Sequence, residues 1–176
     1  MKKIYILCIT LSLTLASCSN DDNSADISGD ILGTWNMESY TYSGTASTSF
    51  QGQSINSSFV AEAFNINYQL TFSENPNIVT GMGDFGITIE STTFGQTETQ
   101  TINNISSLVP NDQSNSAEWS QSGNQLTFIT PERTDVFTIL ELSDSTLRLD
   151  LVLNESVEEE GLIINTNIEA DIVFTR

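Results

Sequence analysis

The sequence contains no histidine, and its only lysines and cysteines, Lys2, Lys3, Cys8 and Cys18, lie at the N-terminal end. Histidine is the commonest general base and a frequent ligand of transition metals, and lysine is the residue that forms Schiff bases. The chain also lacks a Gly-x-Ser-x-Gly elbow, a phosphate-binding loop and any Cys/His cluster. We therefore expect no catalytic residues, no metal site and no cofactor.

Basic residues are scarce, with five Lys and Arg against 23 Asp and Glu, a formal charge of −18. Beyond Lys2 and Lys3 only Arg133, Arg148 and Arg176 face the 23 acids, which leaves a charge of −20. Such a surface repels phosphate backbones and anionic lipid, so we do not expect nucleic acid as a partner. High acidity is typical of a soluble, monomeric domain, and a specific cationic partner is the less common alternative.

Residues 1–17 have the pattern of an export signal. Two lysines precede an apolar run over residues 4–15, which is shorter than the roughly 20 residues that a membrane-spanning helix needs. The following Leu15-Ala16-Ser17-Cys18 resembles the bacterial lipobox. This resemblance implies removal of residues 1–17 as a signal peptide and lipidation of Cys18 with a diacylglyceryl group and an amide-linked acyl chain such as palmitate. The alternative is an ordinary secretory signal with a chance cysteine.

The residues after Cys18 are polar and acidic. Ser19-Asn20-Asp21-Asp22 resembles the short signal that carries Bacteroidetes lipoproteins to the outer face of the outer membrane, and its alternative is a solvated tether. We expect a lipid-anchored outer-membrane protein at the cell surface, with residues 18–30 as an acidic tether and residues 31–176 as one domain. Since Cys8 would leave with the signal and Cys18 would be acylated, packing alone would stabilise that domain.

Period-two alternation dominates the domain and predicts half-buried antiparallel strands. It is clearest over residues 64–72, 147–153 and 164–174. Weaker strands are predicted over residues 34–42, 78–83, 85–93, 117–121, 125–130 and 135–142. Turn-forming residues separate many of these segments, and no segment has a helical stripe. We expect an all-β fold, an up-and-down antiparallel meander of about 8–10 strands that closes into a barrel, because closure removes exposed edges.

Two segments, residues 43–58 and 91–107, are rich in Ser, Thr, Gly and Gln. Residues 48–53 and 92–96 share a short echo in which Thr, Phe, Gly and Gln recur. Each segment is either a mobile loop or a pair of extended polar strands, and the alternation does not decide between them.

Gly33-Thr34-Trp35 opens the first strand and matches the Gly-x-Trp signature of lipocalins. A Phe-Ser-x-x-Pro turn, a second Trp before a Gly turn and the Phe-x-Arg end complete a pattern that resembles the lipocalin-like lipoproteins of Bacteroidetes. The resemblance implies a lipocalin-like barrel whose base contains Gly33, Trp35 and Arg176, with the guanidinium over the indole. The chain ends on a strand, whereas full lipocalins carry helices on both sides of the barrel.

An eight-stranded barrel has space for side chains or for one small ligand. Six aromatic residues are candidates for a ligand cavity: Phe64, Tyr68, Phe72, Phe85, Trp119 and Phe128. The alternative is that they fill a solid core. Asp144-Ser145-Thr146 resembles the O-glycosylation motif of Bacteroidetes, with Ser145 as the acceptor, although a tight turn prefers the same residues. Glu158-Glu159-Glu160 lacks the spacing of a calcium site.

The leading hypothesis is a non-enzymatic binding module that takes a small apolar or amphipathic ligand inside the barrel. The second is a structural or interaction lipoprotein, in which the barrel is filled and the Ser/Thr-rich segments contact a protein or glycan. A third is a hydrolase, which would need two carboxylates that converge in a cleft.

Overall fold

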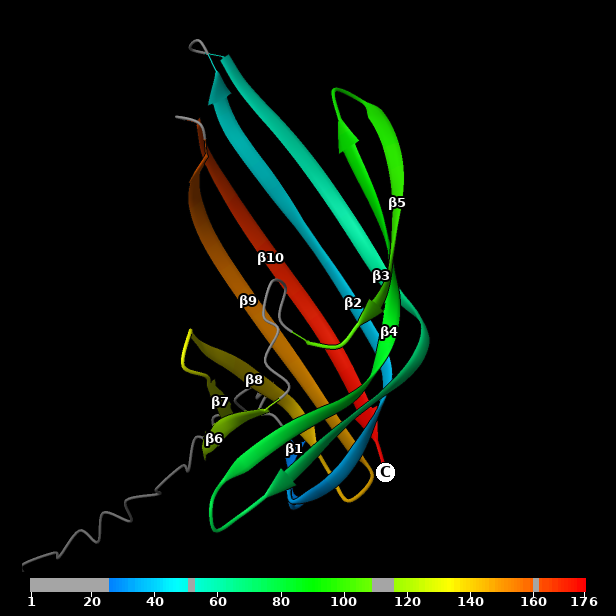
Figure 1. The fold of residues 1–176 in the computed structure, drawn as a ribbon, viewed down its shortest axis with the longest axis vertical. Coiled ribbons are helices and arrows are strands. Elements are labelled where there is room, and N and C mark those ends of the chain that lie inside the picture. Colours follow the sequence, from blue (N-terminus) through cyan, green and yellow to red (C-terminus); the bar gives the residue numbers. More distant parts are fainter. Residues whose placement is uncertain (1–25, 51–52, 109–115, 160–161) are drawn as a thin grey trace, which may run out of the picture.

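The computed structural model describes residues 26–50, 53–108, 116–159 and 162–176. The predicted signal peptide, Cys18 and most of the predicted tether lie outside this range. Ten strands form a single sheet (Figure 1). They are β1 (Asp26–Ile27), β2 (Gly33–Phe50), β3 (Gln53–Ser73), β4 (Ile78–Thr93), β5 (Gln96–Ile105), β6 (Ser116–Ser122), β7 (Gln125–Ile129), β8 (Thr134–Leu142), β9 (Thr146–Glu159) and β10 (Leu162–Thr175). In the part of the chain described, no helix is long and apolar enough to cross a bilayer.

Eight strands close into a hydrogen-bonded ring in the order β2, β3, β4, β6, β7, β8, β9 and β10, with β10 paired to β2. Every pairing in the ring is antiparallel, whereas β1 adds to β8 in parallel. The predicted all-β antiparallel meander is therefore confirmed, including its closure. The predicted strands at 78–83 and 85–93 form one continuous strand, β4.

The strand β4 has two partners on the same edge. Its first residues, Ile78 to Thr80, pair with β6, and its second half from Phe85 pairs with β5. The ring is closed only over the length of the short strands β6, β7 and β8. Beyond it, residues 43–50, 53–60, 88–93, 96–105, 152–159 and 162–169 form a curved six-stranded sheet, which we call the open half (Figure 1).

Both Ser/Thr-rich segments belong to the open half. They lie in the β2–β3 and β4–β5 hairpins, so the alternative of extended polar strands is the correct one. Their echoing residues 48–53 and 92–96 include the ends of these two hairpins. The side chain of Phe50 in the first echo lies outside the described part of the chain.

The ring is filled by large side chains. Its fully buried members come from strands far apart in the sequence: Trp35, Phe85, Leu126, Phe137, Ile139, Leu142, Leu147, Leu149, Leu151, Ile172 and Phe174. The residues of β9 and β10 that were predicted to share a face do so, since Leu149 is opposite Ile172 and Leu151 is opposite Ala170. Burial of this apolar area is the main force that stabilises the fold.

A β-bulge in β3 overturns part of the predicted pattern. Asn65 has a positive φ of 49°, and the pairing with β4 shifts register between Phe64 and Asn67. Because a bulge inserts one residue, it reverses the alternation. Phe64 therefore lies opposite Gly86 on the outer face, which it shares with Glu62, and not on the inner face with Tyr68. Its ring lies over Gly86, where a Cβ would meet Phe64 at 2.3 Å.

The base of the ring is closed by Trp35 and Arg176. Trp35 is fully buried, and its indole Nε1 donates to the carbonyl of Ile31 at 2.8 Å. The guanidinium carbon of Arg176 lies 4.1 Å from the Trp35 ring centroid, so the predicted stacking is confirmed. The same guanidinium donates to three backbone carbonyls, those of Asp144, Leu32 and Asp30, at 2.8, 2.8 and 3.0 Å. We call this arrangement the base clamp.

The predicted tether ends earlier than residue 30. Asp26 and Ile27 pair with β8, and the amides of Ser28 and Gly29 both donate to the carbonyl of Leu142 at 2.8 Å. Gly29 runs so close to β8 that a Cβ there would lie 2.3 Å from the carbonyl oxygen of Ser143. Residues 26–30 are therefore part of the folded domain.

We expect Arg176→Gln to lower the free energy of unfolding by about 1–3 kcal/mol, since it removes the cation–π contact and charge-assisted bonds to three carbonyls. Urea denaturation of residues 19–176 would measure this loss. Arg148→Gln is the matched control, because it breaks only the exposed pair with Asp171 and should cost at most about 1 kcal/mol. Equal losses in the two variants would contradict a special role of the clamp.

Candidate functional site

Five of the six predicted ligand residues are packed inside the ring. Tyr68, Phe72, Phe85 and Phe128 are buried, and Trp119 is half-buried. Their rings contact one another: Phe72 lies 5.6 Å from Trp119 and 5.9 Å from Phe128, and Tyr68 lies 5.7 Å from Phe85. These residues therefore pack into the core of the ring, and their contact with a ligand stays a prediction. Phe64, the sixth, lies on the outer face.

Leu108, in the segment that follows β5, packs into the core of the ring beside Tyr40. Leu108 is buried, and its carbonyl accepts a 3.0 Å hydrogen bond from the hydroxyl of Tyr40. Burial raises the pKa of Tyr40 far above its ordinary value, so this hydroxyl stays a donor at every physiological pH. The ring of Tyr40 contacts those of Phe85 at 5.6 Å and Tyr42 at 5.8 Å. Tyr42 directly precedes Ser43, the first residue of β2 in the open half.

The inner face of the open half carries apolar side chains that nothing in the described chain covers completely. Cross-strand partners share a face of the sheet, and Ala170 and Tyr42 are partners on the inner face. Every second residue beyond them in β2 and β10, together with the partners of these residues in β9, therefore also lies on the inner face. Six apolar residues of β3, β9 and β10 lie on this face, each half-buried or exposed: Ile55, Phe59, Leu153, Val157, Ile164 and Ile168. Small and hydroxyl-bearing residues alternate with them: Gly44, Ala46, Thr48, Ser57 and Thr166.

Phe59 and Tyr42 form the aromatic floor of this face. Their ring centroids are 6.1 Å apart with the rings nearly perpendicular. Gly44 makes this contact possible, because a Cβ at Gly44 would lie 2.5 Å from the tip of the Phe59 ring. Burial also raises the pKa of Tyr42, which therefore remains a neutral phenol. The floor thus presents apolar rings and one neutral hydroxyl.

A charged cluster lies where the ring meets the open half. Asp135 is 3% exposed, and its carboxylate is bound by Arg133 at 2.6 Å. The same guanidinium lies 3.9 Å from the carboxylate of Glu155, which shares the inner face of β9 with Val157 and Leu153. With one arginine between two carboxylates, the cluster carries a net negative charge.

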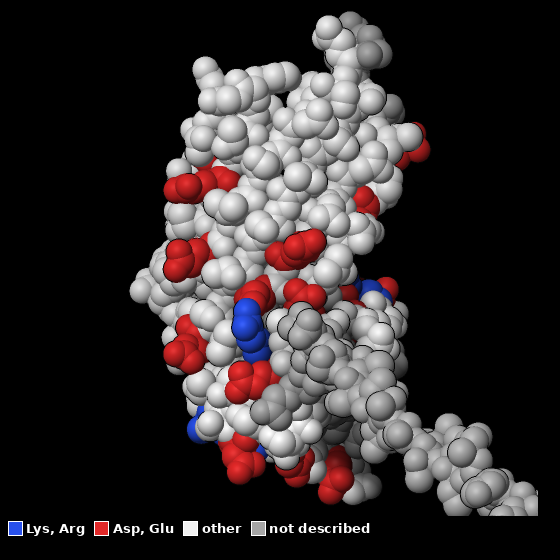
Figure 2. Space-filling model, turned by 180° about the vertical axis from the view of Figure 1, so that it is seen from behind, with Lys and Arg blue, Asp and Glu red and all other residues white. Residues whose placement is uncertain are grey.

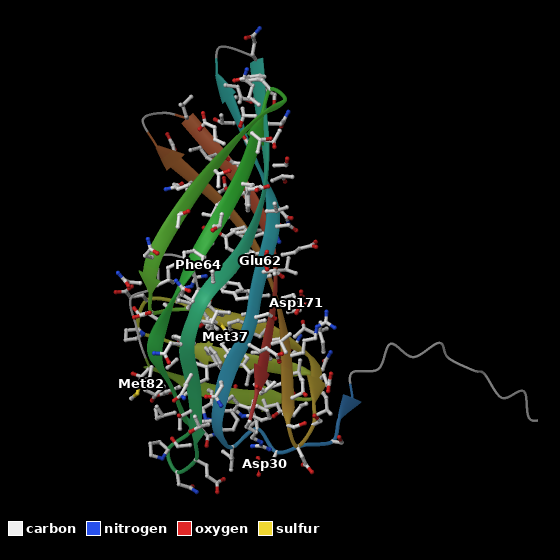
Figure 3. The ribbon with its side chains drawn as sticks, turned by 90° about the vertical axis from the view of Figure 1, so that its right-hand side faces the viewer. Asp30, Met37, Glu62, Phe64, Met82 and Asp171 are labelled. Carbon is white, nitrogen blue, oxygen red and sulfur yellow. The ribbon has the colours of Figure 1, made fainter. Side chains whose placement is uncertain are left out.

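A separate groove of about 600 Å³ crosses the outer face of β9, β10, β2, β3 and β4. Its rim carries five carboxylates: Asp150, Asp171, Glu169, Glu62 and Glu90. Glu62 and Asp171 lie at about mid-height of the molecule (Figure 3), and the space-filling view from behind shows how strongly acidic side chains outnumber basic ones (Figure 2). A second, smaller groove of about 390 Å³ lies along β2, β9 and β10. Uncharged Thr, Ser and Asn residues line it, and Glu155 is the one charged residue among the described residues of its lining.

One of these carboxyls, that of Asp150, is both partly buried and close to other carboxylates. Asp150 and Asp171 are direct cross-strand partners, but only Asp171 is bound by Arg148, whose Nε lies 3.0 Å from it. Partial burial, then the charges of Asp171 and Glu169, raise the pKa of Asp150, and Arg148 opposes this effect. The groove lies on the outer surface of a sheet, so water reaches these groups. Solvated carboxylates of this kind are a surface feature and not by themselves a hydrolase site.

The remaining candidates lie at turns. Ser145 is exposed in the β8–β9 turn, where its carbonyl accepts the backbone amide of Arg176 at 3.2 Å, and its glycosylation stays a prediction. Glu158 is exposed near the end of β9. Among the described residues, no three acidic side chains are grouped so as to hold a metal ion.

Sequence reasoning missed the residues that define the boundary between ring and open half. The alternation of Asp135 with Phe137 and Ile139 could have indicated that Asp135 points inward. Nothing local indicated that Leu108 enters the core, since it follows a polar segment. The inner apolar face was also missed, because Phe59 and Ile55 are embedded in runs of Ser and Asn.

In a comparison with known families, residues 31–149 match the model described as a lipocalin-like domain. No curated protein and no solved structure matches the chain. The matched segment runs from the residues before β2 to β9, and it includes Gly33, Trp35 and both Ser/Thr-rich hairpins.

We expect Asp150→Asn to stabilise the protein at pH 7, because it removes a partly buried charge that Asp171 and Glu169 repel. The gain should be at most about 0.5 kcal/mol, since solvent screens this repulsion. Because the pKa of Asp150 is raised in the folded protein, its carboxylate lowers the free energy of unfolding at a pH above that pKa, and this loss of stability disappears as the pH falls through the pKa. The advantage over wild type should therefore vanish in mildly acidic buffer and shrink in high salt. Urea midpoints from pH 4 to pH 8 would measure it, with Glu158→Gln as the charge control. A variant less stable than wild type at pH 7 would refute this account.

Proposed function

The chain belongs to the lipocalin-like domain family, and from that premise we propose that it is a non-enzymatic binding protein. In this proposal, lipid on Cys18 holds it at the outer membrane, on the cell surface. It takes a small amphipathic ligand on the inner face of the open half, between Tyr42 and the ends of the β2–β3 and β9–β10 hairpins.

The observation that carries this proposal is the partly exposed apolar inner face of the open half. Val157 is 52% exposed, and Ile164, Ile168 and Phe59 are half-buried around it. A soluble domain gains free energy when such side chains are covered, at about 25 cal/mol per Å². Because hydroxyl-bearing residues alternate with them, the face suits a ligand that has both an apolar body and hydrogen-bonding groups.

The charges on the inner face favour one kind of head group. Glu155 lies on β9, and Glu98 lies on the same face of β5, as its pairing with Ser91 indicates. The only nearby arginine, Arg133, is bound to Asp135. An anionic head group would be repelled there, so we propose a neutral or cationic amphiphile, in keeping with the charge of −20 on the mature chain.

The attachment of residues 26–30 supports an orientation on the membrane. From Cys18 to Asp26 the chain spans at most about 28 Å if fully extended. Asp26 joins β8 near the base clamp, whereas the open half lies at the opposite end of the molecule (Figure 1). A lipid-anchored protein would thus keep its base near the bilayer and direct the open half away from it.

A second candidate function rests on the solid packing of the ring. Because the predicted aromatic residues pack against one another in the core, the Ser/Thr-rich hairpins are the alternative contact region, and they suit a protein or glycan. In that case the apolar inner face would bind part of a larger partner and not a free small molecule.

The ligand hypothesis can be tested with a neutral apolar dye such as Nile red and with native mass spectrometry of the protein from its host. Ile164→Gln places an amide on the inner face and should weaken dye binding about tenfold. Ile163→Gln alters the neighbouring residue on the outer face, which is 55% exposed, and should leave binding unchanged. Equal binding by all three proteins, with no co-purifying small molecule, would favour the second candidate.

The anchor and the orientation can be tested separately. Cys18→Ser should release the protein from membranes into the soluble fraction, because no lipid can be added. For the lipidated protein on vesicles, dyes at Glu74→Cys in the β3–β4 turn and Gln96→Cys at the β4–β5 tip should report different distances to a lipid-bound acceptor. We expect much stronger energy transfer from residue 74. Equal transfer would contradict the orientation without affecting the anchor.

A further inference from the structure

The strand β5 has a free edge. Its ten residues pair with β4 on one side, and no described residue pairs with it on the other. Nine of the ten side chains are exposed, and only Ile105 at its end is partly buried. In Figure 1 the β4–β5 hairpin stands apart from the strands β9 and β10 at the same end of the molecule.

The pairing with β4 shows which main-chain groups face outward. Phe94 and Gly95 form the two-residue turn, and both have positive φ, 52° and 76°, as in a type I′ turn. Such a turn is flanked by a hydrogen-bonded pair, here Thr93 and Gln96. Since hydrogen-bonded and non-hydrogen-bonded pairs alternate in antiparallel sheets, the amide and carbonyl groups of Thr97, Thr99 and Thr101 point away from β4.

This edge has few of the features that usually protect edge strands. Proteins block such edges with charged side chains, especially lysine, with proline or with bulges. From Gln96 to Thr101, β5 has neither lysine nor proline, and its register with β4 is regular. The other free edge of the open half, residues 152–159 of β9, carries Glu155 and Glu158. The edge of β5 carries one charged side chain from Gln96 to Thr101, that of Glu98, and is therefore the less charged of the two edges.

We propose that the edge of β5 docks an extended cationic segment of a partner protein, which adds to the sheet as an antiparallel strand. The main-chain groups of Thr97, Thr99 and Thr101 supply the hydrogen bonds. Charge selects a cationic segment, because the mature chain carries −20 and Glu98 lies at the centre of the edge. The same charge disfavours a second copy of this chain. The proposal holds whether or not the inner face takes a small ligand.

The register predicts the side chains of the partner segment. Residues opposite Thr97, Thr99 and Thr101 lie on the outer face, where β-branched side chains pair well. On the inner face, a lysine or arginine fits opposite Glu98 and an apolar residue fits opposite Ile102, which is 39% exposed. A suitable segment therefore alternates β-branched residues with one apolar and one basic residue.

The probe for this site is the C-terminally amidated peptide Ile-Thr-Gln-Thr-Lys-Thr, which carries an uncharged fluorophore such as a neutral BODIPY dye, and binding is measured by fluorescence anisotropy with the intact folded protein. Thr99→Pro removes an amide that β4 does not use, and it should weaken peptide binding at least tenfold. Thr99→Val keeps that amide and the branched shape, and it should bind as wild type does. Circular dichroism and thermal melting would establish that both variants are folded.

A second arm tests the charge. Replacing the peptide lysine by glutamine should weaken binding to wild type severalfold, and Glu98→Gln should remove this preference together with most of the salt dependence. Neither change alters the main chain, so this arm remains informative if Thr99→Pro fails to fold. No binding of the peptide to wild type, or full binding to folded Thr99→Pro, would overturn the proposal. Self-association of wild type that Thr99→Pro abolishes, without peptide binding, would assign the edge to a second copy and overturn the proposed partner.

Discussion

The base clamp of Trp35 and Arg176 is the interaction on which the rest of the structure depends. It joins the beginning of β2, the end of β10, the β8–β9 turn and the segment that leads in from β1. These are the places where the first and last strands must meet for the sheet to close. A closed ring has no exposed edges, so its strands can be buried on their inner face without a covering layer of helices.

Closure has a consequence for function, because a small ring is filled by its own side chains. Phe85, Phe137 and Phe174 are fully buried inside it, and Leu108 is buried in the same core. The part of the sheet that is free to bind is therefore the part that does not close. The short strands β6, β7 and β8 end early, and the long strands continue as the open half with an apolar inner face, two free edges and no covering element among the described residues.

The three arginines of the domain, Arg133, Arg148 and Arg176, are all occupied within the fold. Arg133 binds buried Asp135, Arg148 binds Asp171, and Arg176 covers Trp35. No cation beyond these three occurs after Lys3, so the acidic groups on the surface are largely uncompensated. This balance favours neutral or cationic partners at both proposed contact regions, the inner face and the edge of β5, and it makes their affinity depend on salt.

The sequence by itself determined the strands and their antiparallel order, because period-two alternation and turn residues act over short distances, whereas the contact of Arg176 with Trp35 was expected from the resemblance to lipocalins. It did not place Phe64, since the bulge at Asn65 reverses the alternation and depends on the register with β4. Nor did it distinguish a filled ring from a cavity, because that depends on how side chains from eight strands share one interior. The tertiary structure alone showed that large side chains from eight strands fill the ring, that Leu108 packs into the same core, and that the surfaces proposed to bind lie where the ring does not close.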